Sequence, residues 1–242
     1  MRSIVTKQAS SRVMSLILLL PGFAAVAGDQ QADLLVYRVE EAGSEPYLSR
    51  ILVTPGFLRM DQDNENGGFI LYDREAQIIY SVDPDERSIL VIEPERGQRR
   101  LPEEMKLSIE KLSDIDAPAV SGSKPEHWRM TVNGTTCQQT VVAPGLMPQG
   151  VAAYRDYLDL LAYQHVTSLA AIPAEYRDGC DDAIHVFAPS ALLEKGLPLR
   201  TWDANGNQQT LIDFSADRAV SSDRFKLPAD YRQVPMSSTP TE

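Results

Sequence analysis

The first part of the chain alternates short apolar runs with turn residues. Each run holds four to seven residues rich in Val, Ile, Leu, Tyr or Phe, and Pro, Gly, Asn or Asp punctuate the gaps. The predicted strands cover 34–39, 48–54, 57–60, 69–72, 77–82 and 88–92. Because connections this short join antiparallel neighbours, the pattern predicts a meander of successive hairpins.

Two of these strands are apolar on both faces. In 78–82 and 89–92, side chains of either parity are at least partly apolar, whereas a strand with one solvated face alternates cleanly. We therefore expect a core on one face of the sheet. We expect a helix, a loop or a ligand to cover part of the other.

The remainder of the chain predicts further hairpins and one long helix. Asn133-Gly134, typical of a type I′ turn, separates two apolar runs, although Asn133-Gly134-Thr135 also matches a glycosylation acceptor. Apolar residues at steps of three and four predict a helix over 151–171, which Pro173 ends. The other expected elements are strands over 127–132, 135–142, 184–187, 197–202, 208–214 and 221–225 and a helix over 102–112.

This order of elements predicts the antiparallel α+β class. Repeated β-α-β alternation is absent, which argues against a Rossmann fold or a TIM barrel. We expect one domain over 28–235, with a possible subdivision in the loop near 117–125. The polar residues 236–242 predict a mobile tail.

The N-terminus predicts export. Arg2, Lys7 and Arg12 precede an apolar run over 13–20, and Ala25-Val26-Ala27 is a small-x-small site. The run is shorter than the roughly 20 residues that a membrane span needs. We therefore expect a signal peptide over 1–27, cleaved after Ala27, and a periplasmic protein; an uncleaved anchor is the alternative.

The net charge of the chain limits the classes of partner that it can bind. The chain has 34 acids and 23 bases, a formal charge of −11. Removal of the predicted signal peptide leaves 20 bases and a charge of −14. Such an excess of acid repels nucleic acids and anionic membrane surfaces. We therefore expect no nucleic-acid partner, and no later segment is apolar enough to predict a transmembrane helix.

Cys137 and Cys180 are the two cysteines of the chain. Paired cysteines in an exported protein most often form a disulfide. The bridge would close a loop worth about 4 kcal/mol in the chain-entropy model.

Motifs for catalysis or metal binding are missing. His127, His165 and His185 fit no zinc pattern, and His165 falls on the apolar stripe of the predicted helix, which favours a core histidine. Acidic turns near 61–65 and 178–182 resemble only fragments of calcium loops. We expect no metal, no cofactor and no catalytic residue, although a hydrolase whose carboxylates converge in the fold stays open as an alternative.

Four segments carry a family resemblance: Phe57-Leu58-Arg59-Met60-Asp61, Ile70-Leu71-Tyr72-Asp73, Ile79-Tyr80-Ser81-Val82-Asp83-Pro84 and the closing Phe225 to Tyr231. They are similar to exported domains of the lipoprotein-carrier-like superfamily, which includes LolA, LolB and the RseB sensor. The resemblance covers about 33–93 and 197–232. It implies a strongly bent antiparallel sheet, an incomplete β-barrel, packed on one long helix and one or two shorter ones.

In this family the concave face of the sheet can take an acyl chain or a partner's apolar segment. We therefore expect a periplasmic, non-enzymatic protein that binds a hydrophobic ligand such as an acyl chain, a lipid or a lipoprotein. The expected ligand-binding residues are Leu58, Met60, Leu71, Ile79, Ile89 and Val91. The alternative is a structural or regulatory envelope domain that docks another exported protein, with the 151–171 helix filling the concavity.

Overall fold

The computed structural model describes residues 28–62, 64, 67–94, 99–112, 116–170, 172–173 and 176–236. The signal peptide predicted over 1–27 and, apart from Met236, the predicted tail lie outside the described residues. In the described part of the chain, no helix is both long and apolar enough to cross a membrane.

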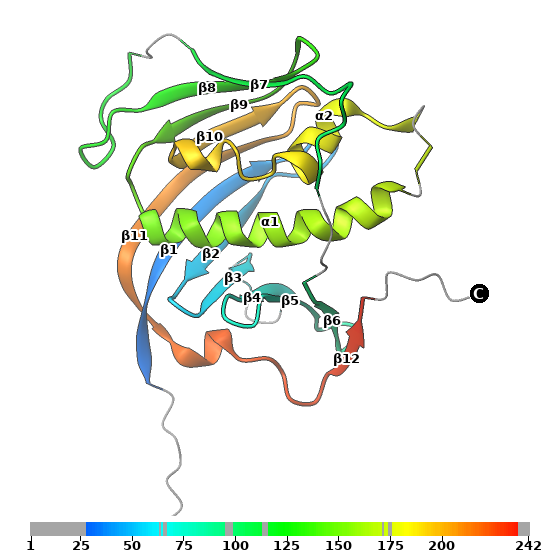
Figure 1. The fold of residues 1–242 in the computed structure, drawn as a ribbon. Helices are drawn as coiled ribbons and strands as arrows, with labels where there is room; N and C mark the ends of the chain where they lie inside the picture. Colours follow the sequence, from blue (N-terminus) through cyan, green and yellow to red (C-terminus); the bar gives the residue numbers. More distant parts are fainter. Residues whose placement is uncertain are drawn as a thin grey trace, which may run out of the picture.

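A single large sheet dominates the molecule (Figure 1). Across the described ranges it has twelve strands, in the order β12-β6-β5-β4-β3-β2-β1-β11-β10-β9-β8-β7. The strands are β1 (Asp29–Glu40), β2 (Tyr47–Val53), β3 (Phe57–Asp61), β4 (Phe69–Asp73), β5 (Ile78–Asp83), β6 (Ser88–Ile92), β7 (Leu107–Lys111), β8 (Glu126–Val132), β9 (Thr135–Ala143), β10 (Leu197–Asp203), β11 (Gln208–Ser221) and β12 (Arg232–Pro235). The predicted meander is confirmed as β1 to β6. Asn133 and Gly134 have φ of 51° and 85°, as a type I′ turn requires.

Within the described residues, helical structure is confined to a few segments. They are α1 (Pro148–Ala170), α2 (Gly179–Asp182), the π-helix η2 (Ala183–Phe187) and the 3₁₀-helices η3 (Leu193–Lys195) and η4 (Ser222–Phe225). The helix predicted over 151–171 corresponds to α1, which begins three residues earlier.

The predicted fold class is wrong. We expected an α+β domain with a bent antiparallel sheet, an incomplete barrel, on one long and one or two shorter helices. The structure instead has one open sheet of twelve strands, mixed because β12 pairs in parallel with β6. In the described residues, α-helix occurs only in α1 and the four-residue α2.

Three local predictions fail because pairing or capping overrides the apolar pattern. The segment 102–112, expected as a helix, contains β7, which pairs with β8. The strand expected over 184–187 is the π-helix that continues α2, and the one over 221–225 is the 3₁₀-helix η4. The 117–125 loop connects β7 to β8 within the second half of the sheet.

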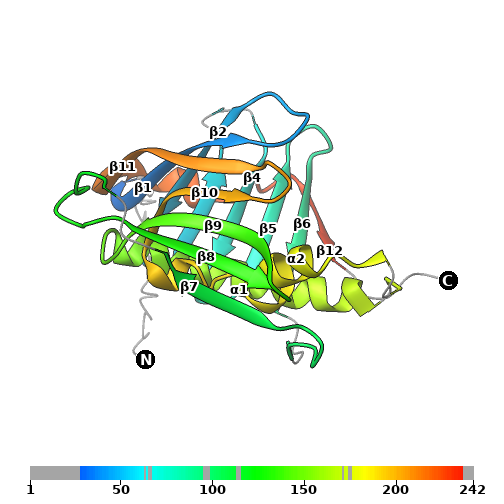
Figure 2. The ribbon, with the colours of Figure 1, turned by 90° about the horizontal axis from the view of Figure 1, so that it is seen from above.

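The two faces of the first half of the sheet have separate cores. On the face that carries α1, here called the inner face, Leu35, Ile51, Leu58 and Tyr72 pack with Tyr157 of the helix. Figures 1 and 2 show α1 lying across this face. On the outer face, a second core is closed by residues that follow β11, including the buried Phe225. Ile79 packs in the inner core and Tyr80 on the outer one, so both faces of β5 are covered by protein.

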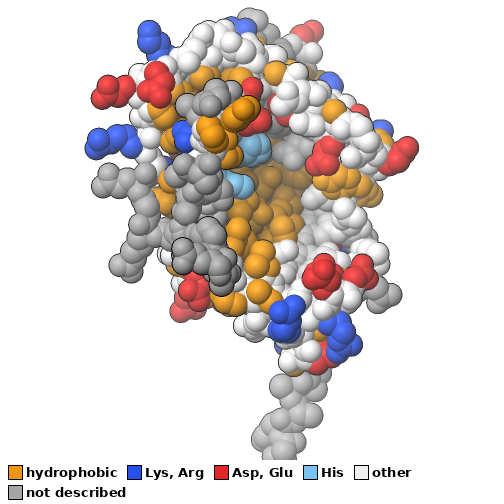
Figure 3. Space-filling model, turned by 90° about the vertical axis from the view of Figure 1, so that its right-hand side faces the viewer, with side chains coloured by type: hydrophobic (Ala, Val, Ile, Leu, Met, Phe, Trp, Pro, Cys, Tyr) orange, Lys and Arg blue, Asp and Glu red, His pale blue; other side chains and the backbone are white. Residues whose placement is uncertain are grey.

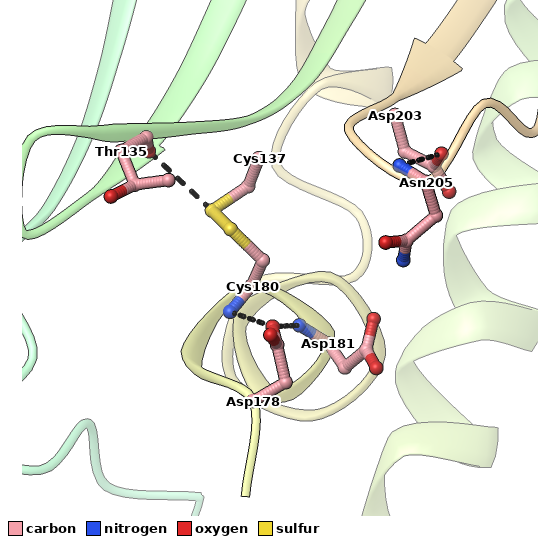
Figure 4. Close-up of a disulfide and its surroundings, with 7 residues drawn as sticks. All are labelled: Thr135, Cys137, Asp178, Cys180, Asp181, Asp203 and Asn205. Carbon is pink, nitrogen blue, oxygen red and sulfur yellow. Dashed lines mark hydrogen bonds between the residues drawn. A yellow bond between two sulfur atoms is a disulfide. The ribbon is translucent and has the colours of Figure 1, made fainter.

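The predicted disulfide between Cys137 and Cys180 is confirmed (Figure 4). In the β8–β9 ladder Gln138 pairs with Met130 and Thr136 pairs with Thr131, so Cys137 is the extra residue at a bulge. Bulges change the direction of a side chain, and this one lets Cys137 join the cluster beneath α2 and η2. The Asp178 carboxylate caps α2 by accepting from the backbone N–H groups of Cys180 and Asp181.

Removal of the disulfide should destabilise the protein. We expect Cys137→Ala combined with Cys180→Ala to lower the free energy of unfolding by about 2–4 kcal/mol, because the unfolded chain loses a 43-residue constraint. Urea titrations followed by circular dichroism measure the loss. Dithiothreitol should produce a similar loss in the wild-type protein and none in the double variant; equal stability of all samples would contradict the structural role.

Candidate functional site

A cavity of about 630 Å³ lies between α1, the segment from η2 to η3, and the inner face of the second half of the sheet. This volume is within the range of small-molecule sites, roughly 300–1,000 Å³. The lining residues are Val39, Glu41, Ala42, Ser44, Gln138, Thr140, Tyr154, Leu158, Ile184, His185, Pro189, Leu192, Leu193, Pro198, Thr201, Trp202, Asp203, Asn207, Gln208 and Gln209. We call this cavity the hollow.

Polar contacts fix the helix that forms one wall of the hollow. At its N-terminal end, the Asp33 carboxylate accepts a hydrogen bond from the backbone of Gly150, which anchors the first turn to β1. Further along, Ser190 donates to both Asp159 oxygens at 3.1 Å. These hydrogen bonds connect α1 to the segment between η2 and η3. The protein's own contacts therefore fix the width of the hollow.

Two arginines also attach α1 to the neighbouring segments. Arg99 donates to Asp159 at 3.0 Å and to the Val186 carbonyl at 3.2 Å, and its guanidinium lies 4.5 Å from the Tyr163 ring centre. Arg155 donates to Glu194 at 3.3 Å. Both arginines therefore connect α1 to its neighbours, outside the lining of the hollow.

The floor of the hollow is a row of uncharged polar residues on adjacent strands. Gln209 of β11 pairs with Thr201 of β10, which pairs with Thr140 of β9, so the three side chains share the inner face. Thr140 Oγ1 donates to the Arg200 carbonyl at 3.1 Å and lies 2.9 Å from Thr201 Oγ1. Gln138, two residues before Thr140, extends this polar floor by one further rung.

The walls of the hollow are mainly apolar. They include Tyr154 and Leu158 from α1 and Ile184 and Leu192 from the η2–η3 segment. Burial raises the pKa of Tyr154, whose hydroxyl hydrogen-bonds with the Gln209 side chain. Figure 3 shows the hollowed face of the molecule, with hydrophobic side chains inside it and histidines beside them. The site is therefore amphipathic, with apolar walls and a polar floor.

Two carboxylates are the acidic members of the lining. Asp203 accepts a hydrogen bond from the backbone N–H group of Asn205 (Figure 4). It also accepts from the backbone N–H group and the side-chain amide of Asn207, and these contacts shape the β10–β11 turn. Glu41 accepts from the Tyr47 hydroxyl at 3.0 Å. Among the described residues, no Lys or Arg lines the hollow.

His165 lies beside the hollow rather than in the core. It is exposed on α1, so the core location expected from the helical stripe is wrong. Its ring centre is 6.4 Å from that of His185, which lines the hollow. Partial burial, and then repulsion from His185, lower the pKa of His165.

The six ligand-binding residues expected from the sequence do not share one surface. Leu58, Met60 and Ile79 belong to or pack on the inner core beneath α1. Leu71, Ile89 and Val91 have the opposite parity and lie on the outer face. The lining of the hollow contains none of the six. Instead the lining comes from elements that the sequence pattern predicted in part but did not assign to a binding site.

The acidic turns do not form a metal site in the described part of the chain. There, no group of three or more His, Cys, Asp or Glu side chains is placed to hold an ion. Asp61 is buried and accepts from Arg59 at 2.6 Å and from Arg50 at 2.8 Å, and Asp178 caps α2. Asp63 and Glu65 lie outside the described residues.

No protein-family model and no curated protein matches this chain. A structure of an uncharacterized conserved protein from Thermus thermophilus overlaps with 9% identity and a TM-score of 0.42, covering 85% of this chain and 91% of that one. Structures of PNGF-II in two space groups overlap with 8% identity and a TM-score of 0.39, covering 85% of this chain and 31% of PNGF-II. Overlaps this weak identify no family, and the resemblance to the lipoprotein-carrier-like superfamily stays a prediction.

The lowered pKa of His165 predicts a pH-dependent contribution to stability. Between that pKa and the ordinary value of about 6.5, the unfolded chain binds more protons than the folded one. Stability should therefore fall as the pH falls through this window. We expect the melting temperature to fall between pH 7.5 and pH 5.5 in both proteins. The fall should be smaller in His165→Gln than in the wild type, by on the order of 1 °C. An equal or larger loss in the variant, measured by differential scanning fluorimetry, would contradict the assignment.

Proposed function

We propose that this chain is an exported, non-enzymatic binding protein whose hollow takes a ligand with an apolar part. The observation that carries the proposal is the 630 Å³ cavity that remains between α1 and the sheet, with apolar side chains from α1 and from the η2–η3 segment in its lining. Water in such a space gains little from the walls, so an apolar group that replaces it is favoured by about 25 cal/mol per Å² of apolar surface that it buries.

The disulfide supports the exported half of the proposal. A bond between Cys137 and Cys180 persists in oxidising compartments such as the periplasm. The predicted signal peptide over 1–27 is consistent with the same location. The acyl chain, lipid or lipoprotein expected at the outset stays a proposal, now assigned to the hollow.

The alternative, an envelope domain that docks another exported protein, has less support. It requires a concavity filled by the helix over 151–171. Although α1 packs on the first half of the sheet through Tyr157 and Leu160, it leaves the space over β9 to β11 open. We therefore favour a small ligand over a protein partner.

Filling the hollow should abolish binding. We expect the purified protein to increase the fluorescence of N-phenyl-1-naphthylamine, an uncharged apolar probe, in a saturable way. Leu158→Trp adds a ring to the wall of the hollow and should weaken this uptake at least tenfold. Native mass spectrometry of the protein purified from its own cells would show whether a ligand co-purifies with it.

Ala152→Trp provides the matched control. Ala152 is exposed on the same helix and does not line the hollow, so its replacement should leave probe uptake unchanged. Melting temperatures of both variants check that the fold persists. The proposal fails when the wild-type protein takes up no probe, or when Leu158→Trp binds as well as Ala152→Trp.

A further inference from the structure

We propose that the hollow selects amphiphiles whose polar part is uncharged and carries hydroxyl or amide groups, and that it discriminates against carboxylate and phosphate head groups. This inference rests on the proposed function and adds the chemical class of the ligand. It follows from three features of the lining: the type of polar group on the floor, the sign of the charges at its edge, and the apolar walls.

The floor offers hydrogen bonds without charge. Thr140, Thr201, Gln138 and Gln209 present hydroxyl and amide groups, each able to donate and to accept. Within the described residues, the hydrogen bonds of Thr140, Thr201 and Gln209 connect them to their neighbours, whereas the Gln138 side chain has no such partner. Gln138 is therefore the group of the floor that is available to a ligand.

The charges at the edge of the floor are unfavourable for anions. The carboxylates of Glu41 and Asp203 line the hollow, and the described residues place no Lys or Arg in ion-pair contact with either one. A carboxylate or phosphate ligand would be repelled by these two carboxylates. Anion sites are normally built from Arg, Lys or clustered backbone N–H groups, and the described lining of the hollow has no arginine or lysine.

The apolar walls stand next to this floor rather than beyond it. Tyr154 and Leu158 of α1 and Ile184 and Leu192 of the η2–η3 segment line the same cavity as Gln138, so a ligand contacts them with its apolar part while its polar groups reach Gln138. Molecules with a hydrocarbon part and a neighbouring sugar or amide fit this arrangement. A fatty acid, whose polar end is a single carboxylate, does not.

Two probes with the same twelve-carbon chain test the inference. Isothermal titration calorimetry at pH 8 compares dodecyl maltoside with dodecanoate, both below their critical micelle concentrations. We expect dodecyl maltoside to bind at least tenfold more tightly. Equal or tighter binding of dodecanoate would overturn the selectivity while leaving the proposed function standing. Binding of neither probe, together with no uptake of N-phenyl-1-naphthylamine, would overturn the proposed function itself.

A charge placed on the floor should reverse the preference. Gln138→Lys adds a cation where the unpartnered amide lies, and we expect it to tighten dodecanoate binding about tenfold, equivalent to about 1.4 kcal/mol. Gln139→Lys is the control, because the next residue of β9 has the opposite parity and does not line the hollow. It adds the same net charge and should leave both affinities unchanged. Equal effects of the two variants would show that net charge alone acts, and would contradict the assignment of Gln138.

Discussion

The pairing of β1 with β11 is the constraint on which the whole molecule depends. Along most of their length, from Asp29 opposite Ser221 to Glu40 opposite Gln208, these strands join a meander made early in the chain to one made late. Neither half contains the hollow on its own, because Val39 of β1 and Gln209 of β11 meet there across this ladder. Contacts so distant in sequence carry a high loop-closure cost, so the strands must be long to stabilise the join.

The hollow itself results from incomplete cover of the inner face. Over the first half of the sheet α1 is in direct contact with the strands, and Tyr157 and Leu160 complete the core. Over the second half the cover is the segment from α2 to η3, tied to β9 by the disulfide and to α1 by the Asp159–Ser190 hydrogen bonds. A covalent attachment and several polar contacts therefore hold the covering segment in place over the floor.

Sequence patterns predicted the strands well where local pairing decides the structure, and poorly where tertiary contacts do. The hairpins of β1 to β6 and the Asn133-Gly134 turn are short-range and were recovered. The Ile184–Phe187 run has β propensity, yet it is helical because Asp178 caps the preceding turn and Cys180 fixes it to the sheet. Thr140 and Gln138 could not be identified as a site, because alternating polar residues in a strand look the same whether they face water or an enclosed hollow.

Hydrogen bonding explains why a polar floor can persist in a site with apolar walls. A buried polar group is costly unless it is hydrogen-bonded, and Thr140, which is fully buried, meets this requirement through Arg200 and Thr201 without any ligand. Gln138 is only half-buried, so water can form hydrogen bonds with its side-chain amide while the hollow holds no ligand. A ligand that displaces this water must supply an equivalent donor or acceptor, or the amide loses a hydrogen bond on binding. Selectivity for hydrogen-bonding, uncharged groups therefore follows from the energetics of the floor as well as from the charges around it.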